Sequence, residues 1–377
     1  MPVISLVNTT HFDFGAVTQL PNALKKLGVS RPFLVSDPGL TAAGLTARVQ
    51  ASAGEAAFVG LYDQTPANPD EASVLTALDA YRAAGADGLV ALGGGSPMDL
   101  AKAVGLLATH DGPLERLGAS ARGGKHIGKI APLIAIPTTS GTGSEVSVGA
   151  VVILANGRKE TIISPHLIPP ISLCDPELTL GLPARITAAT GMDAVTHCIE
   201  AVLVPFSNPP LEAIGYDGVE RAVAEGHLQR AVADGSDRDA RYQMMMASLE
   251  GALAFAKGLG AVHALSHSCG RLPGHRLHHG TLNALFLPGV LRFSEGAARE
   301  KYTRLKRAFG ISPTADLADA VEDLNRKLGL PATLKELGVS SDQIDDIVAY
   351  AVSDLAHLTA LKRPSRDEYA ALAMALL

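Results

Sequence analysis

The sequence predicts an α/β domain followed by an all-helical domain. In the first half, short apolar runs alternate with alanine-rich stretches, a pattern typical of a parallel sheet covered by helices on both faces. After Cys174-Asp175-Pro176, β-branched runs are replaced by long stretches of Ala, Leu, Glu and Arg, which favour helix. A chain of 377 residues with 47% apolar content is long enough for two domains. We therefore expect an α/β domain over residues 1–180 and a helical domain over residues 181–377.

Strands of the first domain are expected where apolar runs are bounded by turn residues. They are Phe33–Ser36, Ala57–Leu61, Gly88–Leu92, Leu133–Ile136 and Ile171–Cys174. The helices between them include Thr41–Ser52, Glu71–Ala84 and Pro97–Leu107. Parallel sheets of this kind bind their ligands beyond the carboxyl ends of the strands, so the loops at those ends are the places to search for a site.

The second domain is expected to contain helices only. The first five are Ala184–Val202, Pro210–Asp234, Ala240–Ala256, Ala261–Ser268 and Thr281–Ala298, and several more follow to the end of the chain. No internal repeat or low-complexity segment interrupts them.

Composition excludes several classes of partner. The net charge is −6 and there is no long basic run, which argues against nucleic acid and anionic membranes and favours small molecules. The N-terminal sequence lacks a basic segment followed by an apolar core, and no apolar run approaches the roughly 18 residues of a membrane helix. We therefore expect a cytoplasmic protein.

The three cysteines, Cys174, Cys198 and Cys269, form no CxxC pair. Their number is odd, so neither a disulfide framework nor a thiolate zinc site is indicated. We expect them to be small buried hydrophobic residues.

Two loops at strand ends have the composition of a nucleotide site. Gly93-Gly94-Gly95-Ser96-Pro97 follows the strand Gly88–Leu92 and precedes a helix that contains Asp99 and Lys102. Glycines let backbone amides approach a ligand, and a helix N-terminus attracts negative charge, so a pyrophosphate fits here. A tight strand-to-helix turn is the alternative interpretation.

The second loop reads TTSGTGSE, from Thr138 to Glu145, and seven of its eight residues are small or carry a hydroxyl. Such a loop can hydrogen-bond a ribose or a phosphate without bulk. Two loops of this kind on one sheet favour a nucleotide crevice.

Asp37 ends the strand Phe33–Ser36, where a carboxylate can bind ribose hydroxyls and repel a 2′-phosphate. This position predicts NAD over NADP, although Asp37 also begins a turn-forming Asp-Pro-Gly. Lys159, in the turn Asn156-Gly157-Arg158-Lys159, is a weaker cofactor candidate because most turn lysines are only solvated. No GxGxxG with an acidic residue about twenty positions later is present, so this is not the standard dinucleotide fingerprint.

Histidines concentrate in one stretch of the second domain. Five of the twelve, His263, His267, His275, His278 and His279, lie between positions 263 and 279. Imidazole is the commonest metal ligand and titrates near neutral pH, so the cluster suggests a metal, a proton path, or both.

Two pairs of side chains are spaced to share one face of a helix. Asp193 and His197 are four residues apart, and so are His263 and His267. One carboxylate and three neutral imidazoles would suit Fe(II) or Zn(II) and leave a position open for a substrate oxygen. The five clustered histidines compete for the places left after Asp193 and His197, and His267 could instead be a proton relay.

The remaining histidines of the cluster suggest a rim around that ion. His275 and His278 are candidates for rim or loop residues, and Arg276 beside them suggests an anionic substrate group, although a plain surface arginine is the more common case.

Four segments read GGGSPMDLAK, PTTSGTGSE, GMDAVTHCIEA and VHALSHSCG…HHGTLNALFLP. In this order and spacing they resemble the iron-containing (group III) alcohol dehydrogenases, and the resemblance covers nearly the whole chain. It implies a dehydroquinate synthase-like architecture, with a Rossmann-like dinucleotide-binding domain, a helical domain that binds the metal and carries catalysis, and an active site in the cleft between them.

The resemblance also implies roles for single residues. The metal ligands would be Asp193, His197, His263 and His279. His267 would lie near the nicotinamide and the substrate, outside the metal shell.

The cofactor residues implied by the resemblance are those of the two loops and their flanks. The pyrophosphate would be held by Gly94, Gly95 and Ser96, and the nicotinamide end would lie near Asp99. The cofactor would be lined by Thr138, Thr139 and Thr142. Asp37 matches the residue associated with NAD preference, and Lys159 matches a cofactor-contacting lysine.

The activity implied is reversible hydride transfer between a primary alcohol and NAD, with Fe²⁺ or alternatively Zn²⁺, in a homodimer or higher homo-oligomer. A metal-independent reductase of the maleylacetate type is one alternative, but such relatives lack the full ligand set. A metal-dependent hydrolase or lyase that uses the nucleotide only structurally is another. The chain departs from the family in a loop about two residues longer between His267 and His279, and in a partial Asn-Pro-x-x-Asp segment from Asn208 to Glu212.

Overall fold

The computed structural model describes residues 8–275 and 277–377. The chain separates into two compact units. The first, here called the sheet unit, contains residues 8–139 and Gly143–Thr179, and the second, the helical unit, contains Ser140–Thr142 and Leu180–Leu377. The short segment Ser140–Thr142 therefore groups with the helices although it lies between two parts of the sheet unit.

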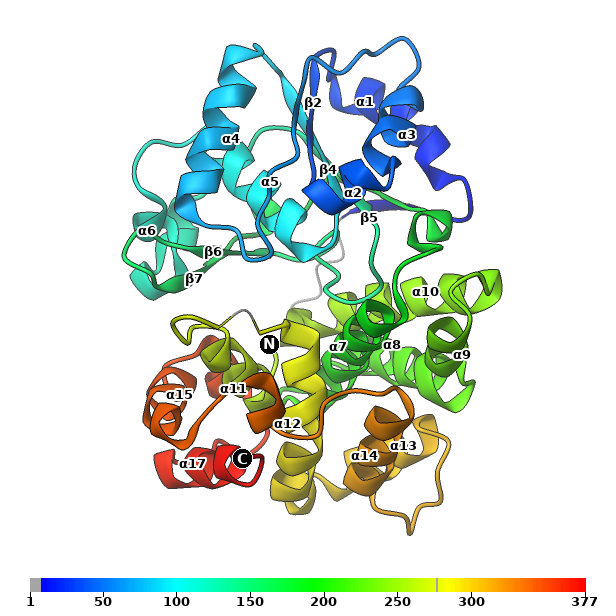
Figure 1. Ribbon diagram of the computed structural model, residues 1–377, viewed down its shortest axis with the longest axis vertical. Helices are drawn as coiled ribbons and strands as arrows, with labels where there is room; N and C mark the ends of the chain where they lie inside the picture. Colours follow the sequence, from blue (N-terminus) through cyan, green and yellow to red (C-terminus); the bar gives the residue numbers. More distant parts are fainter. Residues whose placement is uncertain (1–7, 276) are drawn as a thin grey trace. The chain divides into compact units, whose positions relative to one another are not determined.

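A six-stranded, fully parallel sheet forms the centre of the sheet unit (Figure 1). Its strand order is β1-β8-β5-β4-β2-β3. The strands are β1 (Thr9–Phe12), β2 (Pro32–Val35), β3 (Gly60–Tyr62), β4 (Gly88–Gly93), β5 (Leu133–Pro137) and β8 (Ile171–Cys174). The predicted parallel sheet is confirmed. Strand β1 was not predicted, because its sequence TTHF contains no apolar run.

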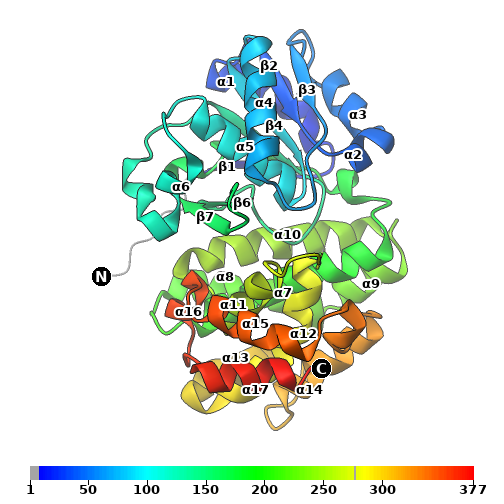
Figure 2. The ribbon, with the colours of Figure 1, turned by 60° about the vertical axis from the view of Figure 1, so that its left-hand side comes forward.

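Helices cover both faces of this sheet. Helices α4 (Glu71–Ala83) and α5 (Gly95–Leu107) pack on one face, and α1 (Leu20–Leu27) and α3 (Leu45–Ala51) pack on the other (Figures 1 and 2). Alternate residues of a strand serve the two cores: Phe33 and Val35 join the core under α4 and α5, and Leu34 joins the opposite one. This two-sided burial is the reason that the strands are continuously apolar.

Glycines with positive φ divide two stretches that the sequence predicts as single helices. The stretch Thr41–Ser52 contains the end of α2 (Pro38–Ala42) and the whole of α3, with Gly44 at a φ of 76° between them. The stretch Pro210–Asp234 contains all but the first residue of α8 (Pro209–Val219), a π-helical turn (Glu220–Ala224), Gly226 at a φ of 75° and α9 (His227–Ala233). A left-handed residue cannot continue an α-helix, so both single-helix predictions are wrong.

A separate antiparallel hairpin, β6 (Gly149–Ile153) and β7 (Lys159–Ile163), was not predicted. Lys159 opens β7 opposite Ile153 and does not lie in the turn where the sequence prediction placed it. The sheet unit also contains α6 (Leu114–Leu117) and short 3₁₀ helices at Ala16–Gln19, Ala119–Ala121, Gly123–His126, Pro165–Leu167 and Pro176–Thr179.

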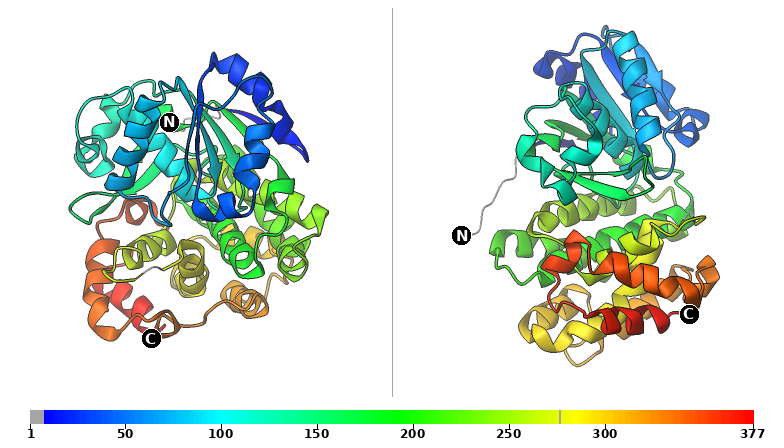
Figure 3. Two further views of the ribbon diagram at one scale, coloured as in Figure 1. Left: turned by 45° about the horizontal axis from the view of Figure 1, so that its top comes forward. Right: turned by 90° about the vertical axis from the view of Figure 1, so that its left-hand side faces the viewer.

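The helical unit contains helices and no strand within the residues described, which confirms the predicted helical class (Figure 3). The further helices are α7 (Ala184–Leu203), α10 (Arg238–Ala254), α11 (Ala261–Cys269), α12 (His279–Ser294), α13 (Arg299–Ala308), α14 (Leu317–Lys327), α15 (Ile344–Ala351), α16 (Leu355–Thr359) and α17 (Arg366–Met374). Helix α7 is the central one, because every residue from Thr187 to Leu203 is buried.

In the part of the chain that the structure describes, no single helix is both long and apolar enough to cross a membrane. One bent pair, Arg238–Lys257 with Ala261–Cys269, meets the length and composition of a span only when the two are joined across a bend of 104°.

Candidate metal centre and cofactor loops

Helix α7 carries Asp193 and His197 on one buried face. The Asp193 Oδ1 atom lies 3.7 Å from His197 Nε2. On its other side, the His197 ring directs Nδ1 toward the Gly141 carbonyl oxygen at 3.2 Å. Because a carbonyl can only accept, Nδ1 carries the proton and Nε2 presents its lone pair toward Asp193.

Helix α11 brings His263 to the same place. Its Nε2 atom lies 3.9 Å from Asp193 Oδ1, and its Nδ1 atom lies 2.6 Å from Oε2 of Glu200, a residue of α7. Burial, together with the neighbouring His197 and His267, holds the pKa of His263 well below its usual value, which favours the neutral ring that a metal needs. Burial also raises the pKa of Glu200 to about 7, against the opposing effect of backbone N–H donors.

Helix α12 begins with His279, whose Nε2 atom lies 3.6 Å from Asp193 Oδ1 and whose Nδ1 atom lies 2.8 Å from Ser266 Oγ. The next residue must be small: a Cβ on Gly280 would lie 2.1 Å from the Ala189 carbonyl oxygen of α7. Gly280 therefore allows the first turn of α12 to approach α7. The side chain of His279 is 31% exposed, whereas Asp193, His197 and His263 are buried. Solvent therefore reaches these four side chains at His279, the first residue of α12.

These four side chains form a compact donor set. One ligand atom from each of Asp193, His197, His263 and His279 lies within 4.8 Å of all the others. Four ligands about 2.1 Å from one ion would lie roughly 3.4 Å apart at tetrahedral angles, close to the separations seen here. One carboxylate oxygen and three neutral imidazole nitrogens suit Fe²⁺ or Zn²⁺, so the residues fit a divalent metal.

His267 lies beside this group and is not part of it. Its ring stacks on that of His279, with centroids 5.2 Å apart and planes at 16°. Its Nδ1 atom lies 3.1 Å from Asp354 Oδ2. Burial alone would raise the pKa of Asp354, but the charge and hydrogen bond of His267 hold that pKa below its usual value.

The other two histidines of the cluster are not members of the donor group. His275 Nε2 accepts from the Gln343 amide at 3.0 Å. His278 is exposed at the boundary of α12, where its carbonyl accepts from Leu282 N at 3.1 Å. Arg276, the candidate for an anionic substrate group, lies outside the described residues.

Three residues of this region were missed by the sequence analysis: Glu200, Asn283 and Asp354. The Asn283 Nδ2 atom lies 2.6 Å from Asp193 Oδ1 and 3.1 Å from Nε2 of both His263 and His279. Glu200 and Asn283 had a local signal, because Glu200 is three residues after His197 and Asn283 is four residues after His279 on the same helices. Asp354 had no local signal in the sequence, because it lies 87 residues from His267 along the chain.

The sheet unit has a topological switch point between β2 and β4. Strand β3 lies beyond β2, and β5 lies beyond β4, so the chain progresses outward in opposite directions from this pair. Ligands of open parallel sheets bind at the carboxyl ends of strands at such a point. Asp37 follows β2 there, and Gly94, Gly95 and Ser96 follow β4.

Backbone contacts connect the two predicted cofactor loops. Thr138 N donates to the Gly93 carbonyl oxygen at 3.0 Å, and a Cβ on Gly94 would lie 3.0 Å from Thr139 Oγ1. Asp37 caps α2 by accepting from Leu40 N at 3.0 Å.

Three other cofactor candidates are placed as follows. Ser96 Oγ donates to the Ala67 carbonyl oxygen, Lys159 Nζ lies 3.3 Å from Asn68 Oδ1, and Thr142 groups with the helical unit.

Asp99 and Lys102, about one turn apart on α5, hold the end of the second loop and the segment that follows it. Asp99 accepts from Ser144 Oγ at 2.8 Å and from Val151 N at 3.0 Å. Lys102 Nζ donates to the carbonyl oxygen of Gly149 at 2.8 Å and is fully buried. Burial raises the pKa of Asp99 and lowers that of Lys102 to about 8, and the attraction between the two charges opposes both shifts.

Comparison with known proteins decides the family. The sequence matches the model of the iron-containing alcohol dehydrogenases over residues 8–176 and that of the C-terminal part of the Fe-containing alcohol dehydrogenase family over residues 187–377. The chain belongs to the iron-containing alcohol dehydrogenase family. The family predicted from the four sequence motifs is thus confirmed.

Individual members of the family resemble the chain along its whole length. A 4-hydroxybutyrate dehydrogenase of Cupriavidus necator is 50% identical over 98% of both chains. The crystal structure of a 1,3-propanediol oxidoreductase superposes with a TM-score of 0.94, at 31% identity and full coverage of both chains. The crystal structure of a sulfoacetaldehyde reductase from Bifidobacterium kashiwanohense in complex with NAD⁺ superposes with a TM-score of 0.90, at 26% identity, over 100% of this chain and 98% of the other.

Membership of the family establishes the class of reaction. The chain is a metal-dependent oxidoreductase of alcohols and aldehydes, as predicted. The family implies a divalent metal and NAD(H), and its substrates are small molecules.

Proposed function

We propose that the enzyme transfers a hydride between a primary alcohol and NAD⁺, with a divalent metal held by Asp193, His197, His263 and His279. The observation that carries the proposal is the convergence of four donor atoms within 4.8 Å of one another. A reductase of the maleylacetate type without metal would not need this complete donor set.

In this proposal the ligand side chains are prepared by their surroundings. A divalent metal, Fe²⁺ by family and Zn²⁺ by donor chemistry as the alternative, supplies Lewis acidity toward the hydroxyl of the alcohol when bound. Asp193 provides the single negative charge of the donor set, and the buried His263 remains neutral.

His267 is proposed to move the proton. Asp354 accepts from Nδ1 of His267, which leaves the lone pair on Nε2 to receive a proton. The ring lies against His279, so the proton acceptor would be next to the donor set without joining it.

NAD is proposed to bind at the switch point of the sheet. The N-terminus of α5, with Gly94, Gly95 and Ser96, would receive the pyrophosphate, because free N–H groups and the helix dipole favour an anion there. Asp37 would bind the ribose and disfavour a 2′-phosphate. The remaining proposed contacts are Asp99, Thr138, Thr139, Thr142 and Lys159.

The substrate proposed is a short primary alcohol that carries a carboxylate. Support comes from the 4-hydroxybutyrate dehydrogenase that is 50% identical to this chain over 98% of its length. We therefore expect 4-hydroxybutyrate, or the corresponding semialdehyde in the reverse direction, to be a better substrate than an uncharged alcohol of the same length.

A cytoplasmic homodimer or higher homo-oligomer is also proposed. The three cysteines are buried and free, which is typical of a reducing compartment. Light scattering on the purified enzyme tests the assembly, and cell fractionation tests the location.

The test follows nicotinamide absorbance with the purified, Fe²⁺-loaded enzyme. 4-Hydroxybutyrate and 1-butanol are compared at equal concentration, each with NAD⁺ and with NADP⁺, and metal analysis is run in parallel. Equal rates with both alcohols would refute the carboxylate preference, and equal rates with both cofactors would refute the role of Asp37. No absorbance change with a panel of alcohols and aldehydes, despite bound metal, would refute the dehydrogenase itself.

A further inference from the structure

Glu200 lies at the junction of the two helices that supply three of the four donors. It follows His197 by three residues on α7 and is 4% exposed. Its carboxylate faces the first turn of α11, where Oε1 accepts from Val262 N at 2.8 Å and Oε2 accepts from Gly260 N at 2.9 Å. His263 directs both its backbone N–H, at 3.4 Å, and its Nδ1, at 2.6 Å, to the same Oε2. One buried carboxylate thus connects α7 with the backbone and the ring of a proposed ligand.

The hydrogen bonds determine which ring nitrogen of His263 carries the proton. Backbone N–H groups can only donate, so the carboxylate oxygens of Glu200 act as acceptors toward Gly260, Val262 and His263. In the same arrangement Nδ1 donates, and a neutral imidazole then keeps its lone pair on Nε2. That atom is the one that lies 3.9 Å from Asp193 Oδ1, on the side of the donor set.

We propose that Glu200 is a positioning residue of the metal centre, which holds the His263 ring in the tautomer and the orientation that present Nε2 to the ion. This inference rests on the proposed metal site. Through its bonds to Gly260 and Val262, the same carboxylate also fixes the start of α11 relative to Asp193 and His197 on α7.

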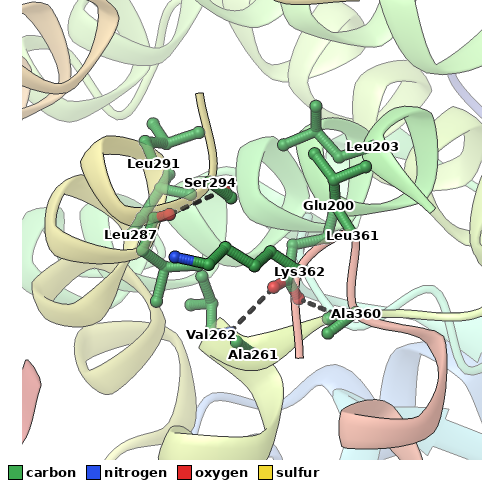
Figure 4. Close-up of a pocket in the computed structure, with 12 residues that line it drawn as sticks. Glu200, Leu203, Ala261, Val262, Leu287, Leu291, Ser294, Ala360, Leu361 and Lys362 are labelled. Carbon is green, nitrogen blue, oxygen red and sulfur yellow. Dashed lines mark hydrogen bonds between the residues drawn. The ribbon is translucent and has the colours of Figure 1, made fainter. Parts of the chain in front are cut away.

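A small cavity lies beside the side chain of Glu200. Figure 4 shows Glu200 and Val262 on the wall of a small cavity that is lined mainly by apolar side chains, among them Leu203, Leu287 and Leu291. The cavity has a volume of about 20 Å³, enough for about one water molecule. A water next to a truncated side chain can bond the free N–H groups of α11, but it cannot fix the ring as a charged carboxylate does.

Cobalt(II) titration of the metal-free protein tests the role, because ligand-field absorption reports the donors directly. Glu200→Ala and Glu200→Gln are compared with Glu212→Gln, a matched control. Glu212 is also a buried glutamate, but its carboxylate accepts from Lys257 at 2.6 Å and from Lys301 at 3.2 Å, and neither lysine belongs to the donor group. All variants are titrated in the same buffer at the same pH.

Loss of a residue that orients a ligand costs about 10- to 100-fold in metal affinity. We expect Glu200→Ala to reach the upper part of that range. Glu200→Gln retains one acceptor oxygen, so its affinity for cobalt should fall about tenfold and its cobalt spectrum should be altered. The Glu212→Gln control should bind cobalt within twofold of the unmodified protein.

Thermal unfolding of the metal-free variants separates positioning from simple capping of α11. If both Glu200 variants unfold at a lower temperature but bind cobalt with the original affinity and spectrum, the inference is overturned. If Glu200→Ala does not fold, the cobalt affinity and spectrum of Glu200→Gln alone decide whether the inference holds. No cobalt binding by the unmodified protein would overturn the metal site itself and this inference with it.

Discussion

Replacing His279 by alanine should weaken metal binding by about 10²- to 10³-fold. Structural metal sites with four protein ligands gain roughly 10–16 kcal/mol on binding, so one ligand of four contributes about 2.5–4 kcal/mol. At 1.4 kcal/mol per factor of ten, this loss corresponds to two to three orders of magnitude in the dissociation constant.

The structure explains why this variant should remain folded. Asp193 and His197 lie on α7 and His263 is held by Glu200, so three donors keep their places without His279. His279 is the most exposed of the four, and water can occupy the space of its ring. The loss should therefore appear in metal affinity and in activity, with little change in the thermal unfolding of the metal-free protein.

The assay is titration of metal-free protein with Co²⁺, followed by absorption, together with the dehydrogenase rate of the Fe²⁺-loaded enzyme. His278→Ala is the matched control, because His278 is the adjacent histidine, is exposed and lies outside the donor group. It should bind Co²⁺ with the affinity of the unmodified protein. The reverse result, in which His278→Ala loses the metal and His279→Ala keeps it, would refute the reasoning and move the ligand by one residue.

Three further predictions concern other contacts of the structure. Lys102→Met should lower the free energy of unfolding by about 1–3 kcal/mol in urea titrations, because it leaves the Ser147 and Gly149 carbonyl oxygens without their donor and the half-buried Asp99 without its partner. It should also weaken NADH binding in fluorescence titrations, and a variant unchanged in both would contradict the role of this pair. The pKa of Glu250 is raised to about 8 by burial and by its hydrogen bond to Asp217, so the folded protein binds this proton more tightly than the unfolded chain. Its contribution to stability is fully present below the ordinary pKa of 4.5 and is lost as pH rises toward about 8, by at most about 1.4 kcal/mol per pH unit. Glu250→Gln should flatten the unfolding temperature over that interval, and an equally steep profile would show that another group is responsible. Gly280→Ala should weaken metal binding and lower the free energy of unfolding by about 1–3 kcal/mol, because its Cβ would lie 2.1 Å from the Ala189 carbonyl oxygen. Gly289→Ala, on the same helix, should retain both metal affinity and stability, because its Cβ would meet Leu372 at an ordinary 3.5 Å. Equal effects of the two substitutions would contradict the steric argument.

The fold was predictable where the signal is local. Strands β2, β4, β5 and β8 are buried on both sides, so their apolar runs identify them within one or two residues. Strand β1 carries no such run, and its pairing depends on the distant strand β8. Strand β6 does carry an apolar run, GAVVI, which was not predicted as a strand, and it pairs with the adjacent strand β7. The breaks at Gly44 and Gly226 were missed because a glycine in a helical pattern does not by itself reveal a positive φ.

The sequence by itself determined the family, the reaction class and the spacing that places Asp193 with His197 on one helix face. Residue spacing alone left the clustered histidines competing, and His279 was named only through the resemblance; the tertiary structure places its Nε2 atom 3.6 Å from Asp193, where α12 approaches α7 at Gly280. It also decided which groups orient the rings: Gly141 for His197, Glu200 for His263 and Asp354 for His267 lie 56, 63 and 87 residues away. Helix periodicity is a local property that can be read along the chain. Contacts between helices arise only when packing joins distant segments.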